Sequence, residues 1–279
     1  MKTTLLLILL FTSPLLIAQN VYIPDANFKA YLVARTDINT NNDTEIQLNE
    51  ASAYNGDILC INLNITDLTG IETFTALTIL NCASNQLTNL NLTQNIGLTW
   101  LSCRNNQLTN LDVSNCIALE YIDCNNNQLA GLDVRNCIAL EQLRCFHNEL
   151  TSLDCSQNPV ISILNCRWNL LSCLNIKNGN NNNLADIGPK DNPLLTCIQV
   201  DDATYSTENW TSIDPQMYFS ENCDYPSDCF TANIDELTTS KNLIQILDLM
   251  GRETAFKPNT PLIYVYDDGS TERVFTIEE

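Results

Sequence analysis

A 21-residue repeat running from Leu77 to about Leu171 constrains the fold of this chain more than any other feature. Four copies and a shorter fifth follow one another without insertion, and the first two read LTILNCASNQLTNLNLTQNIG and LTWLSCRNNQLTNLDVSNCIA. A fixed period of this length is typical of a solenoid, in which each repeat lacks a core of its own and buries its apolar residues against its neighbours. The sequence therefore predicts a stacked array.

Two columns of the repeat are constant, one holding cysteine and the other asparagine. We expect the cysteines to be free, buried and hydrophobic in character rather than metal ligands. We expect each asparagine amide to satisfy buried backbone groups where the chain turns. A shorter column, Cys116 and Cys137, has the same interpretation as the first. The two full columns are Cys82, Cys103, Cys124, Cys145 and Cys166, and Asn85, Asn106, Asn127, Asn148 and Asn169.

The pattern L-x-x-L-x-C-x-x-N-x-L, with second halves such as LTNLDVSNC, resembles the leucine-rich repeat family. That resemblance implies a mainly β solenoid over residues 57–200, with parallel strands and a cap at each end. Alternation within each strand points Leu101 and Cys103 inward. The columns of Leu111 and Val113 predict a second inward face, with a short strand on the far side of each coil.

The outward positions of these strands carry the candidate ligand-binding face. Arginine, tryptophan and tyrosine dominate the energetics of many protein interfaces, and exposed aromatic rings also stack on sugars. The sequence therefore favours a protein or glycan ligand. The alternatives are aromatic residues that only cover the sheet of a rigid spacer, or an inhibitor of a secreted hydrolase. The candidate residues are Trp100, Arg104, Tyr121, Asp123, Arg144, Phe146, Arg167 and Trp168.

The N-terminus has the layout of a secretory signal peptide. Lys2 precedes an apolar run from Leu5 to Ile17, which is short for a membrane span. We expect residues 1–18 to be removed and the mature chain to be secreted or held at the outer cell surface. No later segment has the composition of a transmembrane helix.

Residues 19–56 predict a small helical cap, with helices beginning near Asp25 and near Leu48. The loop between them has the spacing of a degenerate calcium-binding EF-hand loop. Thr44 stands where glycine is expected, so an ordinary Asn/Asp-rich turn is the alternative. Calcium is accordingly the one candidate cofactor. Its ligands would be Asn39, Asn41, Asp43, the carbonyl of Glu45, and Glu50.

The C-terminal part divides into a cap with a connector, residues 201–230, and a β-domain, residues 231–279. We expect a Cys197–Cys223 disulfide if the chain is exported, with Cys229 unassigned. The β-domain predicts three antiparallel strands with an Asp-Gly turn between the last two. It resembles the C-terminal sorting domain of the type IX secretion system, which implies that secretion machinery as a partner. The alternative is a small accessory domain.

Charge and motifs exclude several functions. The formal net charge of −20 argues against nucleic acid, which requires clustered lysine and arginine. The single histidine, His147, is expected to be solvated, and no Ser-His-Asp set can be proposed around it. The sequence holds no phosphate-binding loop and no convincing zinc spacing. We therefore expect a protein that is not an enzyme.

Overall fold

The computed structural model describes residues 19–227, 229–230, 243–248, 252, 254, 262–266 and 271–274. The chain separates into two compact units, residues 1–232 and 233–279. The signal peptide predicted for residues 1–18 lies outside the described residues. Within the described residues, no helix is both long enough and apolar enough to cross a membrane.

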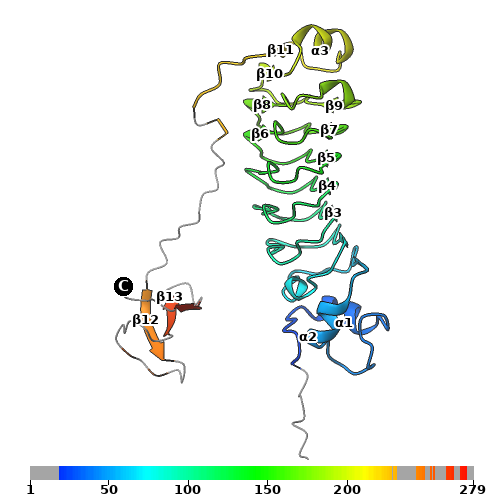
Figure 1. Ribbon diagram of the computed structural model, residues 1–279, viewed down its shortest axis with the longest axis vertical. Coiled ribbons are helices and arrows are strands. Elements are labelled where there is room, and N and C mark those ends of the chain that lie inside the picture. Colours follow the sequence, from blue (N-terminus) through cyan, green and yellow to red (C-terminus); the bar gives the residue numbers. More distant parts are fainter. Residues whose placement is uncertain are drawn as a thin grey trace, which may run out of the picture. The chain divides into compact units, whose positions relative to one another are not determined.

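The first unit is built around a seven-stranded parallel sheet within residues 57–188, each strand coming from one coil of the chain (Figure 1). Leu80, Leu101 and Ile122 are register partners on neighbouring strands, so each coil repeats the one before it. The predicted leucine-rich repeat solenoid is confirmed. Its strands are β1 (Asp57–Leu59), β2 (Ile79–Asn81), β3 (Trp100–Ser102), β4 (Tyr121–Asp123), β5 (Gln142–Arg144), β7 (Ile163–Asn165) and β9 (Asp186–Gly188).

A second parallel sheet forms the far side of the later coils. It comprises β6 (Ser152–Asp154), β8 (Cys173–Asn175), β10 (Cys197–Gln199) and β11 (Tyr218–Ser220). Leu111 and Val113 are buried as predicted, but no far-side strand forms in the coils before Ser152. The expectation of a strand in every repeat was wrong there. Burial requires only the period of the side chains, whereas a sheet also requires the backbones to pair.

The cysteine and asparagine columns form the inner lining of the array. All five cysteines of the main column are free and fully buried, as predicted. The Asn106 amide donates to the carbonyl of Cys82 at 3.1 Å and to that of Cys103 at 2.9 Å. Its Oδ1 accepts the backbone N–H of Leu87 at 3.0 Å. One side chain thus links two coils through groups that would otherwise be buried without partners.

The N-terminal cap contains α1 (Ala26–Val33) and α2 (Leu48–Ala53), and the 3-10 helix η1 (Ile71–Thr73) lies in the first coil of the array. Asp25 caps α1 by accepting the backbone N–H groups of Asn27 and Phe28, which is the role of an N-cap aspartate. Phe28 and Leu32 are fully buried. The cap therefore covers the apolar end of the first coil, as the sequence predicts.

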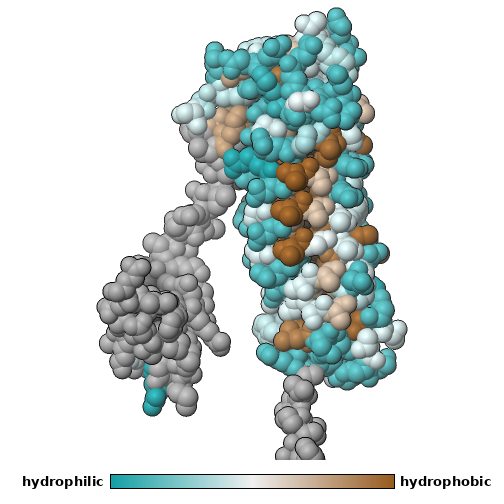
Figure 2. All heavy atoms as spheres, in the orientation of Figure 1, coloured by the Kyte–Doolittle hydropathy of each residue, from teal (hydrophilic) through white to brown (hydrophobic). Residues whose placement is uncertain are grey.

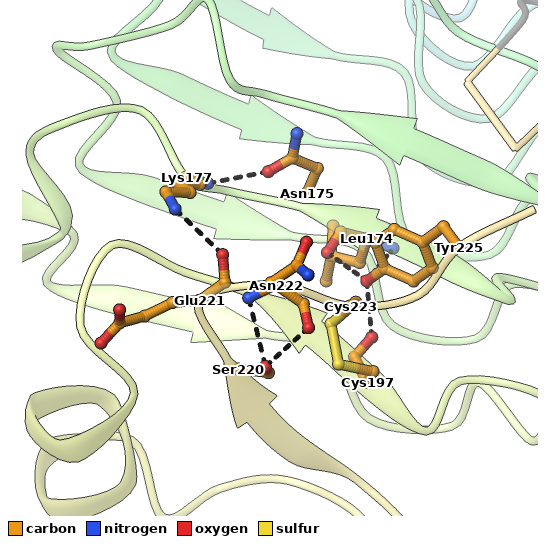
Figure 3. Close-up of a disulfide and its surroundings, with 9 residues drawn as sticks. All are labelled: Leu174, Asn175, Lys177, Cys197, Ser220, Glu221, Asn222, Cys223 and Tyr225. Carbon is orange, nitrogen blue, oxygen red and sulfur yellow. Dashed lines mark hydrogen bonds between the residues drawn. A yellow bond between two sulfur atoms is a disulfide. The ribbon is translucent and has the colours of Figure 1, made fainter. Parts of the chain in front are cut away.

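The C-terminal cap contains α3 (Ala203–Asn209) and strands β10 and β11, and η2 (Asn181–Asn183) lies in the coil before it. The predicted Cys197–Cys223 disulfide is present, and a second bridge joins Cys173 to Cys229. The Tyr225 hydroxyl lies 2.9 Å from the carbonyl of Leu174 and 2.7 Å from that of Cys197 (Figure 3). The two disulfides and this hydroxyl fasten the final segment to the second sheet.

The second unit contains an antiparallel sheet of three strands among its described residues. Its order is β12 (Leu243–Asp248), β13 (Leu262–Tyr266) and β14 (Thr271–Val274). These are the three strands that the sequence predicts. The Asp-Gly turn expected between the last two lies outside the described residues.

Candidate functional site

Three rows of side chains run along the exposed face of the seven-stranded sheet, and each coil contributes one residue to each row. The inward leucines and cysteines alternate with these positions, so the repeat itself aims the rows outward. The structure brings the predicted face residues together. The first row is Ile79, Trp100, Tyr121, Gln142 and Ile163; the second is Asn81, Ser102, Asp123, Arg144 and Asn165; the third is Ala83, Arg104, Asn125, Phe146 and Arg167.

Trp100, Tyr121 and Arg144 form a stack along the array. The Trp100 and Tyr121 rings are parallel to within 3°, with centroids 4.8 Å apart. The Arg144 guanidinium lies 5.7 Å from the Tyr121 centroid and comes from the next strand, within the range of a cation–π contact. The ring spacing matches the spacing of parallel strands, so the rings stack along the array axis and turn their edges outward.

Asp123 is the acidic residue at the centre of this face and is only 5% exposed. It accepts hydrogen bonds from the amide and the backbone N–H of Asn125, and the Tyr121 hydroxyl donates to it at 3.4 Å. Nε of Arg104 lies 4.0 Å away. Burial raises the pKa of the Asp123 carboxyl, and the Asn125 hydrogen bond and the Arg104 and Arg144 charges oppose that rise. Asp123 therefore lies beneath the surface that a ligand would touch.

A second aromatic cluster lies at the carboxyl ends of β5 and β7. The His147 and Trp168 rings are parallel to within 4° at 4.4 Å, and Phe146 meets both edge to face. His147 and Trp168 have positive φ of 52° and 51°. Ser84, Asn105 and Asn126 hold the corresponding conformation in earlier coils. A bulky residue in this region is uncommon and strained, and such strain tends to persist at functional sites.

His147 is a residue that sequence reasoning missed. It is exposed, as the sequence predicts for a solvated side chain, but its stacking on Trp168 was not predicted. The signal was available, because His147 and Trp168 are 21 residues apart and occupy the same repeat position. Two aromatic rings in one column of a solenoid lie on neighbouring coils and can stack.

Arg167 completes the face near β9. A Cβ placed on Gly188 would approach its Nε to 3.1 Å, so the missing side chain of Gly188 leaves room for this arginine. Nε of Arg167 is buried and has no hydrogen-bond partner within the described structure. An unsatisfied donor of this kind is unusual in a folded protein.

In the loop from Asn39 to Glu50, the carboxylates of Asp43, Glu45 and Glu50 are already engaged by donors. Glu50 accepts the N–H groups of Thr40, Asn41 and Gln47, while both Asp43 oxygens accept hydrogen bonds from within the loop. The Glu45 carboxylate pairs with Lys29 at 2.6 Å.

One buried side-chain oxygen of the loop, Oδ1 of Asn39, has no hydrogen-bond partner. The described residues hold no group of three or more histidine, cysteine, aspartate or glutamate side chains that could hold a metal ion. Calcium binding by Asn39, Asn41, Asp43, Glu45 and Glu50 stays a prediction.

A row of exposed aliphatic side chains also follows the repeat, away from the sheet face. Ile96, Ile117 and Ile138 are 59%, 59% and 62% exposed, and Val160 continues the series one position out of register. Figure 2 shows apolar side chains gathered in a row along the array on a largely hydrophilic surface. The sequence analysis did not single out this column, although its period is that of the repeat.

Comparison with solved structures identifies the fold. An internalin of Listeria monocytogenes, InlF, matches with 18% identity and a TM-score of 0.53; the match covers 74% of this chain and 59% of the internalin. The functional domain of InlJ from the same organism, described as including a cysteine ladder, matches with 22% identity and a TM-score of 0.30, covering 72% of this chain and 62% of that domain. A leucine-rich repeat protein of Leptospira interrogans matches with 17% identity and a TM-score of 0.40, and the match covers 59% of this chain and 48% of that protein.

No protein-family model and no curated protein matches the sequence. At 18% identity, the likeness to InlF shows a shared leucine-rich repeat fold. This chain spans about three-fifths of that internalin's length.

Proposed function

We propose that this protein is an exported, non-enzymatic recognition protein that binds a protein ligand through the exposed face of its seven-stranded sheet. The observation that carries the proposal is the ladder of Trp100, Tyr121 and Arg144, which places three residues of the types that dominate interfaces side by side. Because parallel strands hold these residues, little side-chain freedom remains to be lost on binding.

The stacking favours a protein over a glycan. A sugar ring stacks on an open aromatic face, but Trp100 and Tyr121 cover one another, and Arg144 lies beside Tyr121. The same holds for His147 and Trp168, which stack on each other. The ring edges and guanidinium groups of this face suit the mixed polar and apolar side chains of a protein.

A rigid spacer without a ligand is the second candidate. It requires no arginines on the face and no bulky residue in a strained conformation, yet Trp168 is 45% exposed at positive φ. Earlier coils of the array have serine or asparagine at the position of Trp168 and stack on their neighbours in the same way. The Trp168 column therefore favours recognition, of which inhibition of a secreted hydrolase would be one form.

Export is part of the proposal. The hydrophobic N-terminus has the layout of a signal peptide, and two disulfides are consistent with an oxidising compartment. We further propose that the three-stranded C-terminal unit is a type IX sorting domain that carries the protein to the outer surface or the medium. Its antiparallel order supports this assignment.

The proposal is tested by comparing two double variants of the full chain in capture experiments. Trp100→Ala/Arg144→Ala removes the centre of the face, whereas Tyr22→Ala/Arg135→Ala removes one aromatic residue and one arginine away from it. Proteins from the surroundings of the producing cell are captured on each variant and on the wild type, and thermal unfolding checks that each variant folds.

We expect the face variant alone to lose its captured partner, by at least about tenfold in affinity, because central aromatic and arginine residues dominate interfaces. Capture of the same partner by both variants would show that the face is not the binding surface. If the folded wild type captures no protein, the result would favour a rigid spacer without a ligand.

A further inference from the structure

The arginines of the cap and the array divide into two groups by their ion pairs. Away from the face, Arg35 pairs with Asp37 at 2.5 Å and Arg135 pairs with Asp133 at 2.7 Å. Among the described residues, Arg144 and Arg167 have no carboxylate within 4.0 Å. The chain carries 33 acidic residues and 13 basic ones, so arginines left without acidic partners stand out.

Arg104 has only one long ion pair. Its side chain is 52% exposed, and its one acidic neighbour, Asp123, lies at the 4.0 Å limit with a side chain that is only 7% exposed. Asp123 is also engaged by Asn125 and Tyr121. A carboxylate arriving from outside would therefore meet an accessible guanidinium with no strong internal competitor.

The repeat places these arginines within four successive coils, those of β3, β4, β5 and β7. Arg144 is in the second row, while Arg104 and Arg167 lie in the third row on either side of it along the array. Parallel strands are about 4.8 Å apart, so the three guanidinium groups span only a few coils. This span suits a short segment of chain with two or three carboxylates.

Building on the function proposed above, we infer that the partner presents a short acidic segment, with aspartate or glutamate beside apolar or aromatic residues, to Arg104, Arg144 and Arg167. Guanidinium groups form strong, directional hydrogen bonds with carboxylates. The rings of Trp100, Tyr121 and Phe146 offer contacts for the apolar neighbours. The arginines of the face would thus pair with the ligand's carboxylates, although the protein as a whole is strongly acidic.

The surrounding charge favours a short segment over a long polyanion. The formal charge of the chain is −20, so most of its surface repels anions at a distance. A long acidic polysaccharide would extend beyond the arginines and meet this repulsion along its length. A protein segment can confine its carboxylates to the face, and we therefore argue for an acidic protein segment.

A random 12-residue peptide display library, selected on the immobilised full chain, tests this inference. Enriched peptides are resynthesised with Asp and Glu replaced by Asn and Gln. Their affinities are then measured for the wild type, for Arg144→Gln/Arg167→Gln and for the control Arg135→Gln. We expect the selected peptides to be enriched in acidic residues. Replacing those residues by Asn and Gln, or changing the protein to Arg144→Gln/Arg167→Gln, should each weaken the affinity by roughly tenfold to a hundredfold. The Arg135→Gln control should bind like the wild type.

The outcomes separate this inference from the function on which it rests. Peptides that are not acidic, but whose binding is lost in Trp100→Ala, would overturn the acidic partner and leave protein recognition standing. If the folded wild type enriches no peptide over Trp100→Ala/Arg144→Ala, both fail. Binding of polygalacturonate to the face in preference to every selected peptide would also overturn the acidic protein segment.

Discussion

The asparagine column shows how one residue type holds successive coils together. The Asn127 amide donates to the carbonyls of Cys103 and Cys124 at 3.1 and 3.0 Å, and its Oδ1 accepts the Leu108 N–H at 3.0 Å. The same contacts recur at Asn148 and Asn169. Leucine and cysteine fill the core, but only a side chain that both donates and accepts can satisfy these turns.

Replacement of Asn127 by alanine should therefore destabilise the array strongly. It leaves one buried N–H and two buried carbonyls with fewer partners, at about 1–3 kcal/mol for each group left unsatisfied. We expect the free energy of unfolding, measured by urea denaturation, to fall by about 2–4 kcal/mol. The exposed neighbour Gln128, replaced by alanine, should change it by less than about 0.5 kcal/mol. Equal effects of the two changes would contradict the role assigned to the column.

The period of the repeat predicts the face residues, because a period of two fixes which side chains point outward. Trp100, Tyr121, Arg144 and Asp123 were placed on one surface by that rule alone, and the structure brings them together. The shared repeat position of His147 and Trp168 indicates that they are neighbours, but the geometry of their stack depends on a left-handed backbone, which aromatic residues do not signal. The burial of Asp123 depends on Asn125 folding back over it, a contact that spacing does not encode.

At the scale of elements, the two caps differ in how well the sequence predicts them. The helices of the N-terminal cap follow from local signals such as the Asp25 N-cap. In the C-terminal cap, the Cys197–Cys223 bridge was expected, but the partner of Cys229 is Cys173, 56 residues earlier in the chain. Pairing over that separation depends on where the last segment crosses the second sheet, and the sequence carries no local mark of it.

Removal of the Cys197–Cys223 bridge should loosen the C-terminal cap alone. The bridge closes a loop of 26 residues, which corresponds to about 3 kcal/mol of stabilisation in the chain-entropy description. In Cys197→Ala/Cys223→Ala, we expect amide hydrogen exchange to accelerate in β10, β11 and α3. Exchange in β3 and β4 should be unchanged, because each coil contacts only its neighbours. Acceleration along the whole array would contradict this local role.

At the scale of the whole molecule, the array contains many buried thiols. Nine of the thirteen cysteines are free, and all nine are buried. Burial raises the pKa of the Cys60, Cys137 and Cys166 thiols to about 12 and that of Cys116 to about 11. The remaining five thiols are shifted in the same direction by the same cause. Because the pKa of each thiol differs between the folded and the unfolded chain, the free energy of unfolding depends on pH.

The protein should lose stability steeply in alkaline solution. In the unfolded chain each thiol ionises near pH 8.5–9. In the folded array Cys116 keeps its proton to about pH 11 and Cys166 to about pH 12, and burial raises the pKa of the other thiols as well. Below pH 8 both states hold the proton and the thiols make no difference. Above pH 9 the unfolded state alone releases it, so the free energy of unfolding falls by about 1.4 kcal/mol per pH unit for each thiol. Nine such thiols give a slope on the order of 10 kcal/mol per pH unit.

Urea denaturation between pH 6 and pH 11 measures this slope. We expect a plateau to about pH 8 and cooperative unfolding by roughly pH 10–11, because the free energy lost over one pH unit is comparable to the whole stability of a typical domain. Replacing Cys103, Cys124 and Cys145 by alanine lowers the plateau through the cavities left behind, but it should reduce the slope by about a third, since three of nine thiols are gone. An unchanged slope in that variant, or a wild type that is still stable at pH 11, would show that the thiols do not control the alkaline transition.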